Sequence, residues 1–98
     1  MNIEQVFKKY DDEYLHFGDI ENKFSNRPDL HAFILLDKIL PGTDGRKMDL
    51  VSAAEHDEIF LDINCEGLAR IATEEQIRDL VRCGVRYSDE YDSLAMFV

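Results

Sequence analysis

The spacing of apolar positions predicts a short amphipathic helix at the start of the chain. Over residues 2–10, apolar side chains recur at i, i+3, i+4 and i+7, which places them on one helical face. An acidic run follows at residues 11–13, and the helix macrodipole disfavours negative charge at a C-terminus, so the helix is expected to stop or bend there. Residues 14–25 alternate as an extended segment would, and Gly18 makes a helix less favourable, but the two alternatives stay open.

A second helix is predicted from the residues that delimit it. Pro28 suits a first helical turn, where its missing N–H is no loss, and Asp29 complements the positive end of the helix dipole. Pro41 stops the helix after Leu40. The apolar arc between these ends is too broad for a surface helix, so we expect a central core helix. Its apolar residues are Leu30, Phe33, Ile34, Leu35, Leu36, Ile39 and Leu40.

Strand patterns dominate the C-terminal half. Residues 48–54 and 58–63 flank a polar step at residues 55–57, and the second run alternates apolar and polar positions, so the pair predicts a β-hairpin. Residues 85–87 and 94–98, on either side of a polar tip, predict a second hairpin. Its last strand is wholly apolar and is therefore expected inside the sheet.

Two short helices are predicted between the hairpins. Asn64 can cap the first, and Thr73 with Gln76 at the third helical position forms a capping box for a helix over residues 74–83. Gly84 then occupies the position where a left-handed C-terminal residue is wanted, and we expect it to tolerate alanine poorly.

These elements predict a single α+β domain over residues 1–98. The expected architecture has two layers, in which an antiparallel sheet of two β-hairpins, about four strands in all, packs against the N-terminal and central helices. A loop at residues 41–45 separates the two halves of the chain. The pattern does not determine the strand order.

Charge excludes several classes of partner. The 98 residues carry 11 Lys and Arg against 21 Asp and Glu, a formal net charge of −10. Such a surface repels nucleic-acid phosphate and anionic lipid, so we expect no direct nucleic-acid binding and a protein partner with a basic surface. The longest compact apolar run, residues 32–36, is far too short to span a bilayer, so no membrane partner is expected.

The start of the chain and its cysteines indicate the compartment. Residues 1–9 lack the basic start, long apolar stretch and cleavage site of a signal peptide. Cys65 and Cys83 are too few for a disulfide framework and are interpreted as small apolar side chains in a reducing environment. We therefore expect a cytoplasmic protein.

The densest set of potential metal ligands is Glu55, His56, Asp57 and Glu58. Neighbours in a strand or tight turn point to opposite sides, so at most two of these side chains could face one ion without help from elsewhere. We interpret the set as a polar hairpin turn and predict no metal, no cofactor and no catalytic residue. A small metal-dependent hydrolase or nucleotide-processing enzyme that uses this set is the alternative.

Acidic runs at residues 11–13, 55–58 and 89–92 carry the main hypothesis about function. If the first and third share a surface, their carboxylates could imitate a row of phosphates and occupy the basic cleft of a nuclease, restriction enzyme or CRISPR effector. Tyr14 and Tyr87, beside these acids, could serve as interface anchors. We predict a non-enzymatic protein-binding module and favour the second hairpin loop as its contact surface; the sequence does not indicate an oligomeric state. The candidate partner-binding residues are Asp11, Asp12, Glu13, Asp89, Glu90, Tyr91 and Asp92.

Four stretches also carry a resemblance. They are NRPDLHAF at residues 26–33, AAEHDEIFL at 53–61, RCGVRY at 82–87 and LAMF at 94–97. Together these stretches resemble a group of small uncharacterised proteins encoded by bacteriophages and prophages, and the resemblance runs from the second predicted helix onward. It implies a phage-infected or lysogenic bacterial cytoplasm as the setting, and it implies no catalytic residue.

Overall fold

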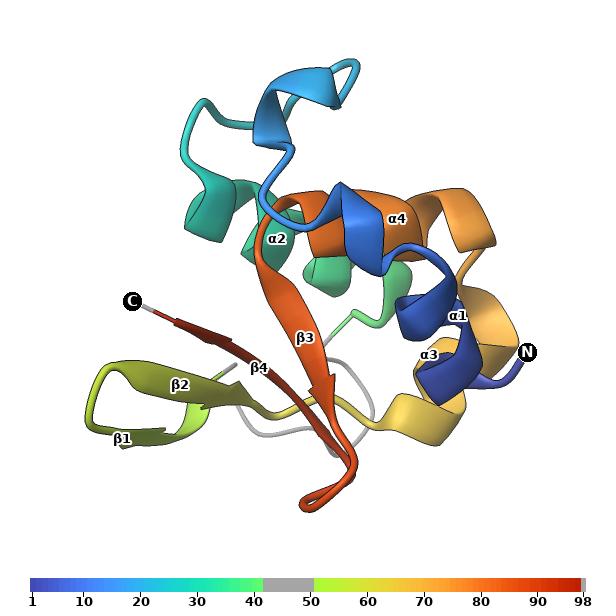
Figure 1. Cartoon of the computed structure of the whole chain (residues 1–98), viewed down its shortest axis with the longest axis vertical. Coiled ribbons are helices and arrows are strands. Elements are labelled where there is room, and N and C mark those ends of the chain that lie inside the picture. Colours follow the sequence, from blue (N-terminus) through green and yellow to red (C-terminus); the bar gives the residue numbers. More distant parts are fainter. Residues whose placement is uncertain (42–50, 98) are drawn as a thin grey trace.

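A computed structural model of the chain describes residues 1–41 and 51–97. Within these residues, four α-helices pack against a four-stranded antiparallel sheet, which confirms the predicted α+β fold. Figure 1 shows the helices grouped around the β3 end of the sheet, while the β1–β2 hairpin projects away from them. The helices are α1 (Ile3–Lys9), α2 (Pro28–Ile39), α3 (Cys65–Ile71) and α4 (Glu74–Arg82), and the strands are β1 (Val51–Glu55), β2 (Glu58–Leu61), β3 (Val85–Ser88) and β4 (Ser93–Phe97).

The sheet has the strand order β1-β2-β4-β3, and every neighbouring pair is antiparallel. Both predicted hairpins are confirmed, and the apolar strand β4 lies inside the sheet as expected. Met96 of β4 is opposite Ile59 on one side and Val85 on the other, which gives the sheet an apolar stripe. Strand β2 ends at Leu61, earlier than predicted, because Asn64 begins the next helix. The predicted loop at 41–45 and first strand from residue 48 fall partly outside the described residues.

The residues predicted as N-caps lie at the N-termini of α3 and α4, and their side chains make the expected hydrogen bonds. The Asn64 carboxamide oxygen accepts hydrogen bonds from the backbone N–H groups at the start of α3. Thr73 and Gln76 form the reciprocal capping box of α4, with distances of 3.1 and 2.9 Å. Helix α1 ends at Lys9, and the acidic run that follows forms the short 3₁₀ turn η1 (Asp11–Glu13). The open stretch at 14–25 contains a second 3₁₀ turn, η2 (Phe17–Asp19), and is otherwise irregular.

Helix α2 is a core helix, as predicted, but its buried face differs from the apolar arc. Leu36 is fully buried, whereas Leu30 is 44% exposed at the solvent edge. His31 is 2% exposed, and its Nδ1 accepts a hydrogen bond from the backbone N–H of Phe24 at 3.1 Å. Burial lowers the pKa of His31, so the imidazole is a neutral member of the core. The largest fully buried side chains are Leu36, Leu61, Leu68, Ile77, Leu80, Leu94 and Val85.

Gly84 connects α4 to β3 in a left-handed conformation, with φ at +96°. We expect Gly84→Ala to lower the free energy of unfolding by about 1–2 kcal/mol, because a Cβ disfavours this conformation and would lie 3.0 Å from Cδ2 of Leu15. Gly18→Ala is the control, since a Cβ there has no neighbour within 4 Å. Urea denaturation of both variants measures the difference, and equal stabilities would contradict the strain at Gly84.

No helix in the described ranges is both long and apolar enough to cross a bilayer.

Candidate functional site

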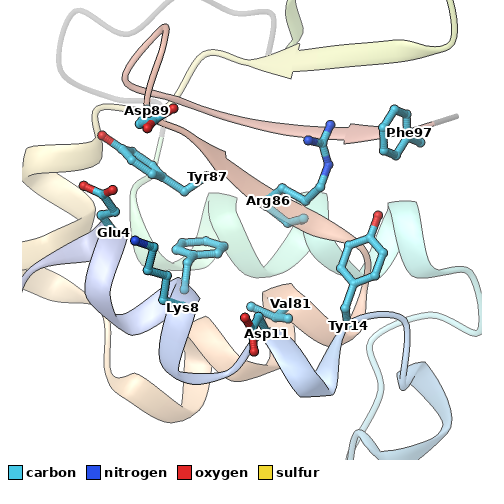
Figure 2. A pocket seen from close by; sticks show the side chains of 11 residues that line it. Glu4, Lys8, Asp11, Tyr14, Val81, Arg86, Tyr87, Asp89 and Phe97 are labelled. Atoms are coloured by element: carbon cyan, nitrogen blue, oxygen red, sulfur yellow. The ribbon is translucent and has the colours of Figure 1, made fainter.

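A groove of about 510 Å³ lies between helix α1 and the outer edge of strand β3 (Figure 2). We call it the β3 groove. Apolar and aromatic side chains from α1, α4 and the sheet line it together with charged ones. The lining residues are Glu4, Phe7, Lys8, Asp11, Tyr14, Val81, Val85, Arg86, Tyr87, Asp89 and Phe97.

Helix α1 forms one wall of the groove and is attached to the N-terminus of α4. Lys9 Nζ lies 2.7 Å from Glu74 Oε1, and the Tyr10 hydroxyl donates to the same oxygen at 3.0 Å. The hydrogen bond from Lys9 holds the pKa of Glu74 below its ordinary value. Phe7, on the inner side of α1, is buried, with its ring centroid 6.4 Å from that of Tyr87. The buried contact of Phe7 and these surface bonds place helix α1 beside the sheet and α4.

Helical spacing brings charged side chains of the N-terminal segment to the groove. Glu4 and Lys8 stand one turn apart on α1, beside the apolar face that contains Phe7, and Asp11 follows in the η1 turn just beyond the helix. All three line the β3 groove. Figure 2 shows Glu4 and Lys8 near Tyr87, and Asp11 further along the same wall, near Val81.

Strand β3 and its neighbours form the opposite wall. The guanidinium of Arg86 forms an ion pair with the carboxylate of Glu58 on β2, and its central carbon lies 4.2 Å from the ring centroid of Phe97. The Tyr87 hydroxyl donates to Asp92 Oδ1 at 2.7 Å, and this bond raises the pKa of Tyr87 to about 12. The charge of Arg86 is thus already balanced within the sheet, and Tyr87 stays protonated at neutral pH.

Two of the candidate partner-binding residues line this groove. Asp11 comes from the first acidic run and Asp89 from the third, and both line the cavity. Asp12 and Glu90 are exposed close by in sequence but are not part of the lining. The first and third acidic runs therefore contribute to one surface feature.

The other three candidate residues make contacts of their own. Glu13 Oε1 accepts from Arg82 Nε at 2.9 Å, and Asp92 accepts the hydrogen bond from Tyr87. The ring of Tyr91 packs edge-on against Phe60, with centroids 5.3 Å apart, beside a second pocket of about 330 Å³. Tyr91 is thus separate from the β3 groove, and Glu13 and Asp92 serve internal contacts.

The ligand-type residues of the first hairpin do not converge. His56 is in the turn with φ at +56° and an 87% exposed side chain, and Glu58 is paired with Arg86. Within residues 1–41 and 51–97, three ligand-type side chains come within reach of one ion only at Glu13, His16 and Asp19, whose ligand atoms lie within 4.8 Å of one another. Glu13 Oε1 there bonds to Arg82, and His16 and Asp19 are exposed surface side chains, so we assign no metal to this cluster.

Both cysteines are buried and free. Burial raises the pKa of Cys65 to about 11 and that of Cys83 to about 12. The Sγ atom of Cys65 also lies 3.6 Å from the backbone oxygen of Asp92. Neither thiol is in the form that acts as a nucleophile at neutral pH, and neither lines the β3 groove.

Sequence reasoning did not assign Glu4, Lys8, Arg86 or Phe97 to the site. Glu4 and Lys8 could have been found, because their separation by one helical turn, just before Asp11, is visible in the sequence. Arg86 and Phe97 could not, because their approach depends on the register between β3 and β4. Comparisons of the chain with protein-family models, with curated proteins and with solved structures give no match. No relative supplies a residue role, and the function must be inferred from the groove itself.

Proposed function

We propose that the protein is a binding module that takes up a basic segment of a partner protein at the β3 groove, and that it acts by binding rather than by catalysis. The observation that supports this proposal is the presence of Asp11 and Asp89, from opposite ends of the chain, in the lining of one groove. Glu4 adds a third carboxylate to the same lining. Three acids around one cavity form a site of the sign that attracts Lys and Arg side chains.

The charge balance of the groove favours a cationic occupant. Arg86 is neutralised by Glu58. The remaining charged lining consists of three carboxylates and the ammonium of Lys8, a net formal charge of −2. The whole chain carries −10, so the long-range field also attracts a basic partner and repels nucleic acid.

The apolar part of the lining favours a protein segment over a simple cation. Phe7, Val81 and Val85 are buried at the base of the groove, and the rings of Tyr14 and Tyr87 also line it. Such surfaces bind the aliphatic stems and apolar side chains of a partner, and aromatic residues dominate the affinity of many protein interfaces. A partner whose basic surface ordinarily contacts nucleic acid would be blocked by this binding, which suits the role of an inhibitor.

Removing the two aspartate charges should weaken partner capture. We expect Asp11→Asn combined with Asp89→Asn to reduce the amount of partner retained from a bacterial lysate at low salt by about tenfold, since each such charge contributes up to about 1 kcal/mol. The captured partners should be basic proteins and should dissociate as the salt concentration rises. Quantitative mass spectrometry of the retained proteins measures both effects.

A matched control variant distinguishes an effect of the groove from an effect of the net charge of the chain. Glu55→Gln combined with Asp57→Asn removes the same charge from the exposed tip of the β1–β2 hairpin, away from the lining. This variant should retain partners almost as the original chain does. Equal losses in the two variants would make the attraction a general effect of charge, and capture that is insensitive to salt would contradict the proposal.

A further inference from the structure

Strand β3 lies at the end of the sheet. Its four residues pair with β4 on one side, and no other strand among the described residues pairs with its opposite side. In an antiparallel sheet, alternate residues of such an edge strand direct their N–H and C=O groups outward. The outer edge of β3 is therefore a template for one more strand.

The β3 groove runs along this same edge. Its lining includes Val85, Arg86 and Tyr87 of the strand and Asp89 just beyond it. Figure 2 shows β3 along one side of the groove and α1 along the other. From Glu4 to Lys8, α1 rises by about 6 Å, a length that about two extended residues would match, and the η1 turn with Asp11 continues the same wall.

We propose that the basic segment binds in an extended conformation, as a fifth strand that hydrogen-bonds to the outer edge of β3. This inference rests on the proposed function and specifies the partner. Side chains of an added strand alternate between two directions. One set would contact the apolar base at Phe7 and Val85, and the other would reach the carboxylates of Glu4 and Asp89. The partner segment should therefore alternate apolar residues with Lys or Arg.

Charge argues against a second copy of the chain as the occupant. Pairing of β3 with its own counterpart would place the acidic rims of two grooves, with Glu4 and Asp89, beside each other. Like charges in such positions are repulsive, and each chain carries a further excess of negative charge. A basic segment of another protein would instead be attracted by these carboxylates.

Peptides of alternating valine and arginine, seven residues long with capped ends, test the inference on the full ¹⁵N-labelled chain. Titration followed by NMR should shift the amide signals of residues 85–88 and 4–11. Two further peptides carry N-methyl groups, one on every valine and the other on every arginine, which removes alternate N–H donors without removing a side chain. One of these two should bind about tenfold or more weakly and the other nearly as well as the parent, because only one set of N–H groups can face β3.

Each result of the titration bears on a different part of the proposal. Equal binding of both methylated peptides would overturn strand addition while leaving the acidic groove as a binding site for basic segments. Failure of every valine–arginine peptide to bind would also overturn strand addition. An alternating valine–glutamate peptide that binds as well as the arginine one would refute the charge preference on which the proposed function depends. Shifts of the same amides on concentrating the chain alone would identify a second copy as the occupant.

Discussion

Leu36→Ala should lower the free energy of unfolding by about 3 kcal/mol, within the range found for leucine truncation in well-packed cores. Leu36 is fully buried on α2, and this helix packs against α4 in the helical layer. The substitution removes apolar contacts and leaves a cavity that the surrounding side chains fill only in part. For a chain of this length, the melting temperature should fall by about 15 °C.

Leu30→Ala is the matched control on the same helix. Its side chain is 44% exposed, so the same truncation removes much less buried surface and should cost below about 1 kcal/mol. The helix propensity gained is the same in both variants, and therefore cancels in the comparison. Urea denaturation monitored by circular dichroism gives both values. Similar midpoints for the two variants would mean that α2 does not pack in the core through the face that contains Leu36.

Arg82→Ala should destabilise the protein by about 2 kcal/mol, less than the loss of one partner from a completely buried ion pair. The Arg82 side chain is 12% exposed and connects α4 to the irregular segment that follows α1. Its Nε donates to Glu13 Oε1 at 2.9 Å, and its Nη1 lies 3.4 Å from both Asp79 Oδ1 and the backbone oxygen of Asp19. Without Arg82, the carboxylates of Glu13 and Asp79 would remain in a largely buried region and would lose their main cationic partner.

The pKa of Asp79 also indicates that Arg82 stabilises the buried carboxylates. Burial raises the pKa of Asp79, and Arg82 is the strongest influence opposing that rise. Arg78→Ala, on the same helix, is the control, because Arg78 contacts the 78% exposed Glu75 at 3.6 Å, such surface pairs contribute little, and its influence on Asp79 is weaker than that of Arg82. Thermal denaturation should show a small change for Arg78→Ala and a large one for Arg82→Ala. A reversed order would mean that the contacts of Arg82 are not stabilising.

The features predicted correctly from the sequence are mainly those that depend on neighbouring residues. Asn64, the Thr73–Gln76 capping box and the left-handed Gly84 each act within one helical turn, so their residue types are sufficient evidence. Both hairpins follow from alternation and short connections. The order β1-β2-β4-β3 did not follow, because it depends on which apolar faces fit together across the whole domain.

The candidate site was only partly predictable for the same reason. The sequence indicates the acidic runs that contain Asp11 and Asp89, but the presence of both residues in the lining of one groove depends on α1 packing beside β3. The place of Glu13 in an acidic run predicts a partner-binding role, whereas its bond to Arg82 joins residues far apart in the chain. Charge patterns therefore indicated the segments, and tertiary packing selected which of their carboxylates face the cavity.

The reactivity of the two buried thiols can be used to measure local unfolding of the protein. Cys65 lies against the β3–β4 turn through Asp92, and Cys83 lies at the end of α4, before β3 begins. Both thiols are buried and protonated at neutral pH. An alkylating reagent therefore modifies them at a measurable rate only in molecules that are locally unfolded. The rate of alkylation at each cysteine would thus follow how often that part of the protein exposes its interior, without any added label.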